Sequence, residues 1–94
     1  ADVVVELPHG LIVIQAKYYS QPVGNGAVQE VSAAKGHYGA VAALVVTNAS
    51  FTTSARVLAK SLNVLLLHHS ELIDAIQALA QPAQGGRSAA DIAY

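Results

Sequence analysis

Asp2 and the pair formed by Gln15 and Lys17 are the residues of this chain whose types could do chemistry together. Asp2 stands at the start of one apolar run, and Gln15 and Lys17 close the next. Alternate side chains of an extended strand share a face, so Gln15 and Lys17 project to one side while Ala16 projects to the other. A carboxylate held beside this pair is the combination expected of a metal-dependent nuclease.

The elements that must position these residues are two strands joined by a tight turn. Residues 2–6 and 11–17 are rich in valine, leucine and isoleucine, and the turn-forming sequence Pro8-His9-Gly10 separates them. The two runs therefore predict a hairpin. Pairing over about five residues on each side of the turn would bring Asp2 near the Lys17 end of the second strand.

Alternating helical and extended patterns follow the hairpin. Small and apolar residues recur at helical spacing from 27 to 38, and the continuous apolar run 42–47 predicts a buried strand parallel to a neighbour. Thr52 can cap a second helix, residues 64–67 predict another buried strand, and Ser70 can cap a last helix. The order hairpin, helix, strand, helix, strand, helix predicts an α/β fold with a mixed central sheet flanked by helices.

The composition indicates an ordered domain with a sheet buried on both faces. Hydrophobic residues make up 53% of the 94 residues, and charged residues only 12%. The apolar runs are far shorter than the roughly 18 residues that span a bilayer, so we expect no membrane contact. The absence of cysteine agrees with a cytoplasmic location. A net charge of -1 gives no general attraction for nucleic acid, so any contact with DNA must be local.

Residues 1–80 are predicted to form the domain, and residues 81–94 a flexible or docking tail. The tail contains Pro82, which marks the expected stop of the last helix, and Gly85-Gly86 among several alanines. The sequence has no methionine and its first residue directly precedes a strand, so we expect an N-terminally truncated fold. Such a fold exposes an apolar sheet edge, which a homodimer would cover.

Five sequence segments occur in a characteristic order along residues 1–80. They are Ala1-Asp2-Val3-Val4, Ile14-Gln15-Ala16-Lys17-Tyr18-Tyr19, Val23-Gly24-Asn25-Gly26-Ala27-Val28-Gln29-Glu30, His37-Tyr38-Gly39-Ala40 and Val46-Thr47-Asn48-Ala49-Ser50-Phe51-Thr52. In this order they resemble the Mrr-like restriction endonucleases of the PD-(D/E)XK nuclease superfamily, in a variant with Gln-x-Lys. The resemblance implies a restriction-endonuclease-like fold and an enzyme that hydrolyses DNA with a divalent metal, usually Mg²⁺.

The resemblance also implies roles for individual residues. Asp2, Gln15 and the carbonyl of Ala16 would bind Mg²⁺ as hard oxygen donors, with Gln15 at the position that Glu or Asp holds in most of the superfamily. Lys17 would position a metal-bound water or help to deprotonate it, and would balance charge in the transition state. The residues expected to contact the substrate are Tyr18, Asn25 and Gln29.

Several of these residues also have simpler interpretations. Outside the family context, Asp2 could be a frayed terminal acid and Lys17 a charged residue that ends a strand. Gln29 and Glu30, early on the first predicted helix, could face the cleft and contact metal-bound water or the DNA backbone, but a solvated helix face is the favoured interpretation of Glu30. The pair His68-His69 does not predict a zinc site, because neighbours on a strand point to opposite faces and no third ligand accompanies them.

Two other functions are compatible with the sequence. A catalytically impaired endonuclease-like fragment could act as a DNA-binding or dimerisation module, which would suit an incomplete fold with a net charge of -1. A nuclease for branched DNA or RNA is also compatible, because Tyr18 and Tyr19 are the predicted aromatic platform and do not distinguish these substrates.

Overall fold

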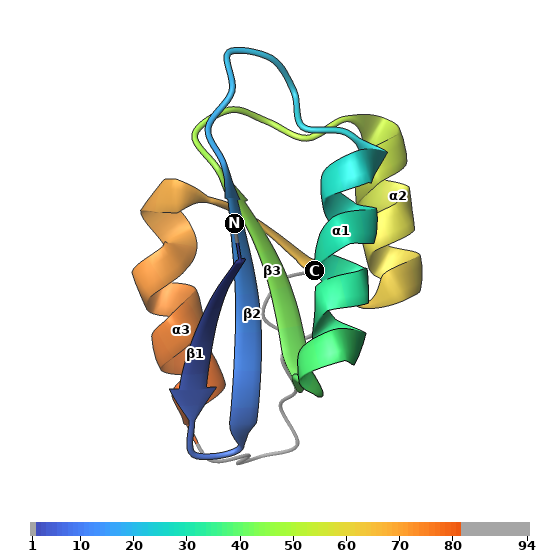
Figure 1. Ribbon diagram of the computed structural model, residues 1–94. Coiled ribbons are helices and arrows are strands. Elements are labelled where there is room, and N and C mark those ends of the chain that lie inside the picture. Colours follow the sequence, from blue (N-terminus) through green and yellow to red (C-terminus); the bar gives the residue numbers. More distant parts are fainter. Residues whose placement is uncertain (1, 82–94) are drawn as a thin grey trace.

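The computed structural model describes residues 2–81, which form a four-stranded sheet with helices on both faces (Figure 1). The elements are β1 (Asp2–Leu7), β2 (Gly10–Lys17), α1 (Asn25–Tyr38), β3 (Ala42–Thr47), α2 (Thr53–Leu62), β4 (Leu65–His68), a 3-10 turn (His69–Glu71) and α3 (Leu72–Ala80). The strand order is β1-β2-β3-β4, with β1 antiparallel to β2 and the other pairs parallel. The predicted α/β order and mixed sheet are confirmed. Apart from Gln81, the predicted tail lies outside the described residues.

The predicted hairpin of β1 and β2 is present, and Asp2 lies at the end of the hairpin that carries Gln15 and Lys17. Asp2 lies opposite Gln15, and Leu7 lies opposite Gly10 at the other end. Gly10 has a φ of 138°, which side chains rarely adopt, and a Cβ built there would lie 2.8 Å from Cγ1 of Val41. The turn thus requires glycine, and its register brings Asp2 beside Gln15.

Two parallel crossovers place α1 and α2 on one face of the sheet, and α3 covers the opposite face (Figure 1). Alternate strand residues separate these two cores: Val13 and Val45 pack with α1 and α2, whereas Ile14 and Leu44 pack with α3. β3 lies between β2 and β4 and is buried along its whole length, as its apolar composition predicts.

The helix caps agree with the sequence in one case and differ in another. The hydroxyl of Thr52 accepts a hydrogen bond from the backbone N–H of Ala55 at 3.1 Å, which confirms the predicted cap of α2. The predicted cap by Ser70 is wrong, because the 3-10 turn begins immediately after β4. His68 therefore holds the capping position, where its Nδ1 accepts from the N–H of Ser70 at 3.3 Å and its own N–H donates to Glu71 at 2.9 Å.

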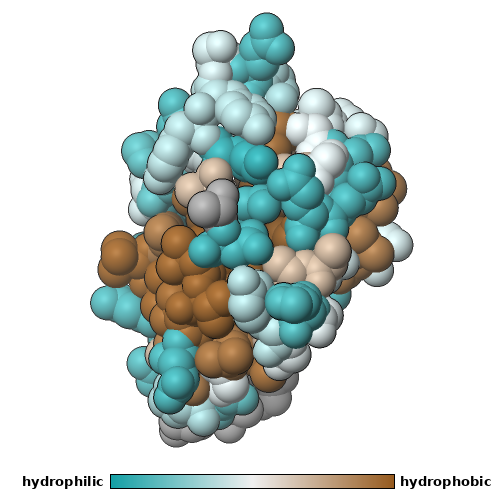
Figure 2. Space-filling view, in the orientation of Figure 1, coloured by the Kyte–Doolittle hydropathy of each residue, from teal (hydrophilic) through white to brown (hydrophobic). Residues whose placement is uncertain are grey.

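β1 is one edge of the sheet and carries exposed apolar side chains. Val3 is 55% exposed and Val4 is 37% exposed. Figure 2 shows a continuous apolar surface around β1, left of and below the centre of the view. An exposed apolar edge was expected from the sequence, and β1 forms it. In the described part of the chain, no helix has both the length and the apolar character needed to cross a membrane.

Candidate active site

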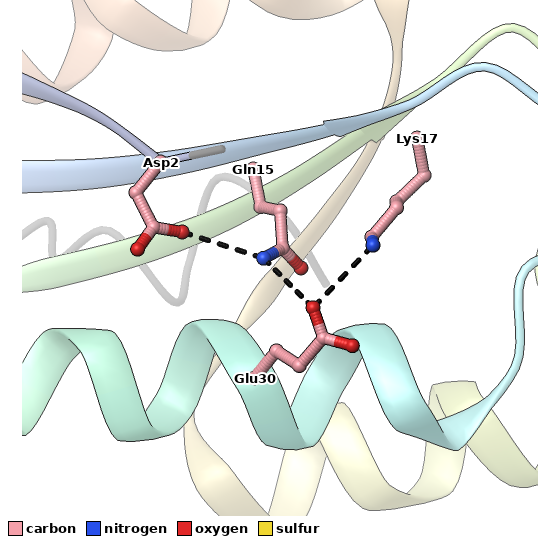
Figure 3. A network of polar contacts seen from close by, with 4 residues as sticks. All are labelled: Asp2, Gln15, Lys17 and Glu30. Atoms are coloured by element: carbon pink, nitrogen blue, oxygen red, sulfur yellow. Dashed lines mark hydrogen bonds and ion pairs between the residues drawn. The ribbon is translucent and has the colours of Figure 1, made fainter.

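Asp2, Gln15 and Lys17 lie together on the face of the sheet that α1 covers (Figure 3). Gln15 and Lys17 project from β2 to this face because they are two residues apart on one strand. The antiparallel register then sets Asp2 of β1 opposite Gln15, and Nε2 of Gln15 donates a hydrogen bond to Oδ1 of Asp2 at 3.3 Å. The structure thus brings together the three residues that the sequence singled out.

Glu30 joins this group from α1 (Figure 3). Its Oε2 accepts hydrogen bonds from Nε2 of Gln15 at 3.1 Å and from Nζ of Lys17 at 3.4 Å. Glu30 is 56% exposed, which agrees with a solvated helix face, but its carboxylate also contacts the group, in keeping with the cleft-facing alternative that the sequence left open. Its carboxylate connects the amide to the ammonium group.

The sequence did contain a signal for Glu30 in the buried stripe of α1. Ala27 and Ala34 are buried in the core beneath α1. Glu30 follows Ala27 by three residues and precedes Ala34 by four, so it lies beside both on the helix surface. A carboxylate at the margin of a buried stripe projects toward the strand that the helix covers, and that strand is β2.

Gln15 is the most buried member of the group. It is 5% exposed, and both hydrogen bonds from its Nε2 go to carboxylates. Its Oε1 is buried and has no hydrogen-bond partner among the residues that the structure describes. A buried carbonyl oxygen without a donor is costly, and native structures usually avoid it outside functional sites.

The charge of Lys17 is stabilised by its neighbours. Burial on its own would lower the pKa of Lys17, but the hydrogen bond to Glu30, the negative charge of Glu30 and the nearby Tyr19 outweigh burial. The pKa is therefore raised above the usual 10.5. Lys17 is cationic at neutral pH and can donate hydrogen bonds but not accept a proton there.

The remaining predicted site residues lie around this group without joining its hydrogen bonds. Ala16 sits between Gln15 and Lys17 on β2 with an exposed side chain. Asn25 and Gln29 are exposed on α1, and Tyr18 is 61% exposed with its ring edge-on to His69 at a centroid distance of 6.1 Å. Among residues 2–81, Tyr18, Asn25 and Gln29 have no side-chain hydrogen bond to the four residues of the group.

The oxygen atoms of the group suit a hard divalent cation. No three His, Cys, Asp or Glu side chains in the described part of the chain come together as a ready-made metal site. The oxygen donors are instead the carboxylates of Asp2 and Glu30 and the amide of Gln15, whose Oε1 has no hydrogen-bond partner within the described residues. Mg²⁺ commonly binds through one or two carboxylates and keeps several waters, so this donor set fits it.

The chain was also compared with known proteins. No curated protein and no solved structure matches it. The family model of the Mrr catalytic domain, described as a restriction endonuclease, matches residues 1–76. This range holds the whole sheet, α1, α2 and all four residues of the group, and it confirms the resemblance found in the sequence segments. The chain belongs to the restriction endonuclease family defined by the Mrr catalytic domain.

Proposed function

We propose that this chain is a Mg²⁺-dependent DNA endonuclease whose active site is formed by Asp2, Gln15, Lys17 and Glu30. Membership of the family supports the nuclease class and DNA as the substrate. The observation that carries the residue assignment is the position of Glu30 Oε2, 3.1 Å from the Gln15 amide and 3.4 Å from the Lys17 ammonium. Together with the hydrogen bond from Gln15 to Asp2, this contact supports a single site with two carboxylates, an amide and a cation.

Asp2, Glu30 and Gln15, with the backbone carbonyl of Ala16, are the residues proposed to hold the metal. A bound Mg²⁺ would supply Lewis-acid polarisation of the phosphodiester and a more acidic water. Gln15 contributes an uncharged oxygen, so the site offers two negative charges to a divalent cation. The half-exposed Glu30 leaves one side of the site open to substrate and water.

Lys17 is proposed to stabilise negative charge on the phosphate. Its ammonium group is held by Glu30, and its pKa is raised, so it remains protonated when DNA approaches. A protonated lysine can donate hydrogen bonds to a phosphate oxygen, where charge develops in the transition state. Of the two roles considered for this residue, charge stabilisation therefore fits the structure better than removal of a proton from water.

The contact with DNA is proposed to be local, because the net charge of the chain is -1. Tyr18, Asn25 and Gln29 are exposed and lie close in sequence to Lys17 and Glu30, and they are proposed as the substrate contacts. Asn25 begins α1, whose first turn carries no acidic residue. The positive end of the helix dipole is thus free of a competing carboxylate near an approaching phosphate.

The test is cleavage of duplex DNA in the presence of Mg²⁺ by the wild-type chain and by Lys17→Ala. Removal of one donor to the transition state lowers the rate by about 10²–10³-fold. Lys60→Ala is the matched control, since Lys60 is exposed on α2 and lies outside the group. Equal cleavage by wild type and Lys17→Ala would show that Lys17 has no catalytic role, and loss of activity in Lys60→Ala would point to general charge instead.

A second candidate is a dimerisation or DNA-binding module with little catalytic activity, and the exposed valines of β1 favour it. Val3 and Val4 present an apolar edge that a homodimer would cover. A homodimer is also compatible with the active enzyme, so catalysis separates the two candidates. Sedimentation and Mg²⁺ calorimetry decide between them: a stable dimer without Mg²⁺ binding supports the module, whereas a monomer that cuts DNA excludes it.

A further inference from the structure

We propose that the side-chain amide of Gln15 is a gate to the metal position. In the metal-free site its NH₂ group holds the carboxylates of Asp2 and Glu30, and the amide turns over to present Oε1 when a divalent cation binds. This inference rests on the proposed function, because it takes Asp2 and Glu30 as the metal ligands.

The hydrogen bonds fix the orientation of the amide in the metal-free site. A glutamine amide has two N–H donors and one carbonyl acceptor. Nε2 lies 3.3 Å from Oδ1 of Asp2 and 3.1 Å from Oε2 of Glu30, so both donors face a carboxylate. The opposite orientation would bring a carbonyl oxygen against two negatively charged oxygens, which is repulsive without a cation between them.

Turning the amide breaks no hydrogen bond of Oε1 in the described part of the chain. Oε1 is buried and has no hydrogen-bond partner among residues 2–81, so the turned amide would place its NH₂ group in that position without losing a partner of Oε1 there. Turning requires rotation about the last side-chain torsion only, which is broad and roughly two-fold. The choice between the orientations therefore depends on what occupies the space between Asp2 and Glu30.

The gate has a consequence for the affinity for metal. When the binding-competent orientation is a minor population, the apparent affinity is reduced by its fraction. The amide thus keeps two carboxylates together in the absence of metal and weakens metal binding in return. A glutamate at this position would need no turn, because both of its oxygens are acceptors, but it would add a third negative charge beside Asp2 and Glu30.

The variant Gln15→Glu tests whether the amide weakens metal binding while it stabilises the metal-free site. We expect it to bind Mg²⁺ at least about tenfold more tightly than wild type in calorimetry, a difference of about 1.4 kcal/mol. We also expect a lower melting temperature without metal and a larger rise on addition of MgCl₂. Gln77→Glu is the control for charge alone, since it adds the same charge at an exposed position of α3. Mg²⁺ affinity of Gln15→Glu no greater than that of wild type overturns the gate.

A second measurement uses the wild-type chain and does not depend on the folding of a variant. In a ¹⁵N-labelled sample, the Gln15 side-chain NH₂ resonances should shift on titration with MgCl₂, while those of the exposed Asn63 should stay in place. The Gln15 pair is identified by its loss in Gln15→Met. Unmoved Gln15 resonances at saturating Mg²⁺ overturn the gate.

DNA cleavage measured in parallel separates this inference from the proposed function. If the wild-type chain cuts DNA with Mg²⁺ but its Gln15 resonances stay unchanged, the gate is wrong and the endonuclease assignment stands. If neither wild type nor Gln15→Glu binds Mg²⁺ or cuts DNA, the gate and the endonuclease assignment are both wrong.

Discussion

Replacement of Gln15 by methionine should separate the stability of the fold from the function of the site. Methionine has the same unbranched shape as glutamine but no group that needs a strong hydrogen-bond partner. The position is 5% exposed, so the new side chain would be buried on β2 next to Val13 and Val45 in the strand pattern. The variant removes the amide and leaves the two carboxylates without their common donor.

The size of the effect follows from the contacts of the amide. A hydrogen bond to a charged group contributes about 1.5–3 kcal/mol when it is buried, but the loss of the two bonds from Nε2 costs much less here because Asp2 and Glu30 are exposed and water can replace the donor. Removal of the unpaired Oε1 recovers its desolvation penalty of about 1–3 kcal/mol. The buried thioether adds part of the roughly 1.5–3 kcal/mol that burial of methionine contributes. We therefore expect Gln15→Met to be more stable than wild type by about 0–3 kcal/mol.

The assay is urea unfolding in metal-free buffer, followed by far-ultraviolet circular dichroism because the chain has no tryptophan. Each kcal/mol should shift the melting temperature by about 4–8 °C in a domain of this size. Gln15→Ala is the control: it removes the same polar atoms but leaves a cavity, so it should be less stable than Gln15→Met. Both should lose Mg²⁺ binding. A free energy of unfolding for Gln15→Met more than about 1 kcal/mol below wild type would refute the reasoning, because the hydrogen bonds would then outweigh burial.

Two further predictions concern Lys17 and the cap of α2. The pKa of Lys17 is raised in the folded chain, so its charged form stabilises the fold below pH 10.5 and that contribution is lost as the pH rises through the folded-state pKa. Urea titrations should therefore give a difference in unfolding free energy between wild type and Lys17→Met that is constant at neutral pH and shrinks above pH 10.5. A difference that grows above pH 10.5 would contradict this prediction. Thr52→Ala removes the hydrogen bond to Ala55 and should lower stability by about 1 kcal/mol, whereas Thr53→Ala, at an exposed position, should change it little; equal losses would mean that the cap is not the cause.

The fold could be predicted from the sequence wherever a local pattern determines burial. The apolar run of β3 predicted a buried central strand, and Pro8 and Gly10 marked the turn that sets the hairpin register. The start of the last helix could not be predicted in the same way. Ser70 is a good capping residue by type, but β4 continues to His68 and the 3-10 turn follows at once, so the length of the strand decides which residue caps.

The same distinction between local patterns and packing applies to the residues of the site. Asp2, Gln15 and Lys17 could be grouped because strand periodicity and one short turn connect them. Glu30 and Gln29 are adjacent in sequence, yet neighbours on a helix point about 100° apart. The stripe that includes Ala27 and Ala34 puts Glu30 and not Gln29 at its margin, but which strand this margin meets depends on where α1 crosses the sheet.

The rigidity of the site therefore comes from its uncharged member. Gln15 lies between buried core residues of β2 and β3, whereas Asp2 and Glu30 are exposed and meet through its NH₂ group. Lys17 is held in turn by Glu30, so the contacts run outward from the core to the amide, to the carboxylates and then to the ammonium. A change in the core beneath β2 displaces the amide and every group attached to it. Changes at the exposed β1 edge reach the group first through Asp2, so cover on that edge, by a second copy or by any other partner, would act on the proposed catalysis through this carboxylate.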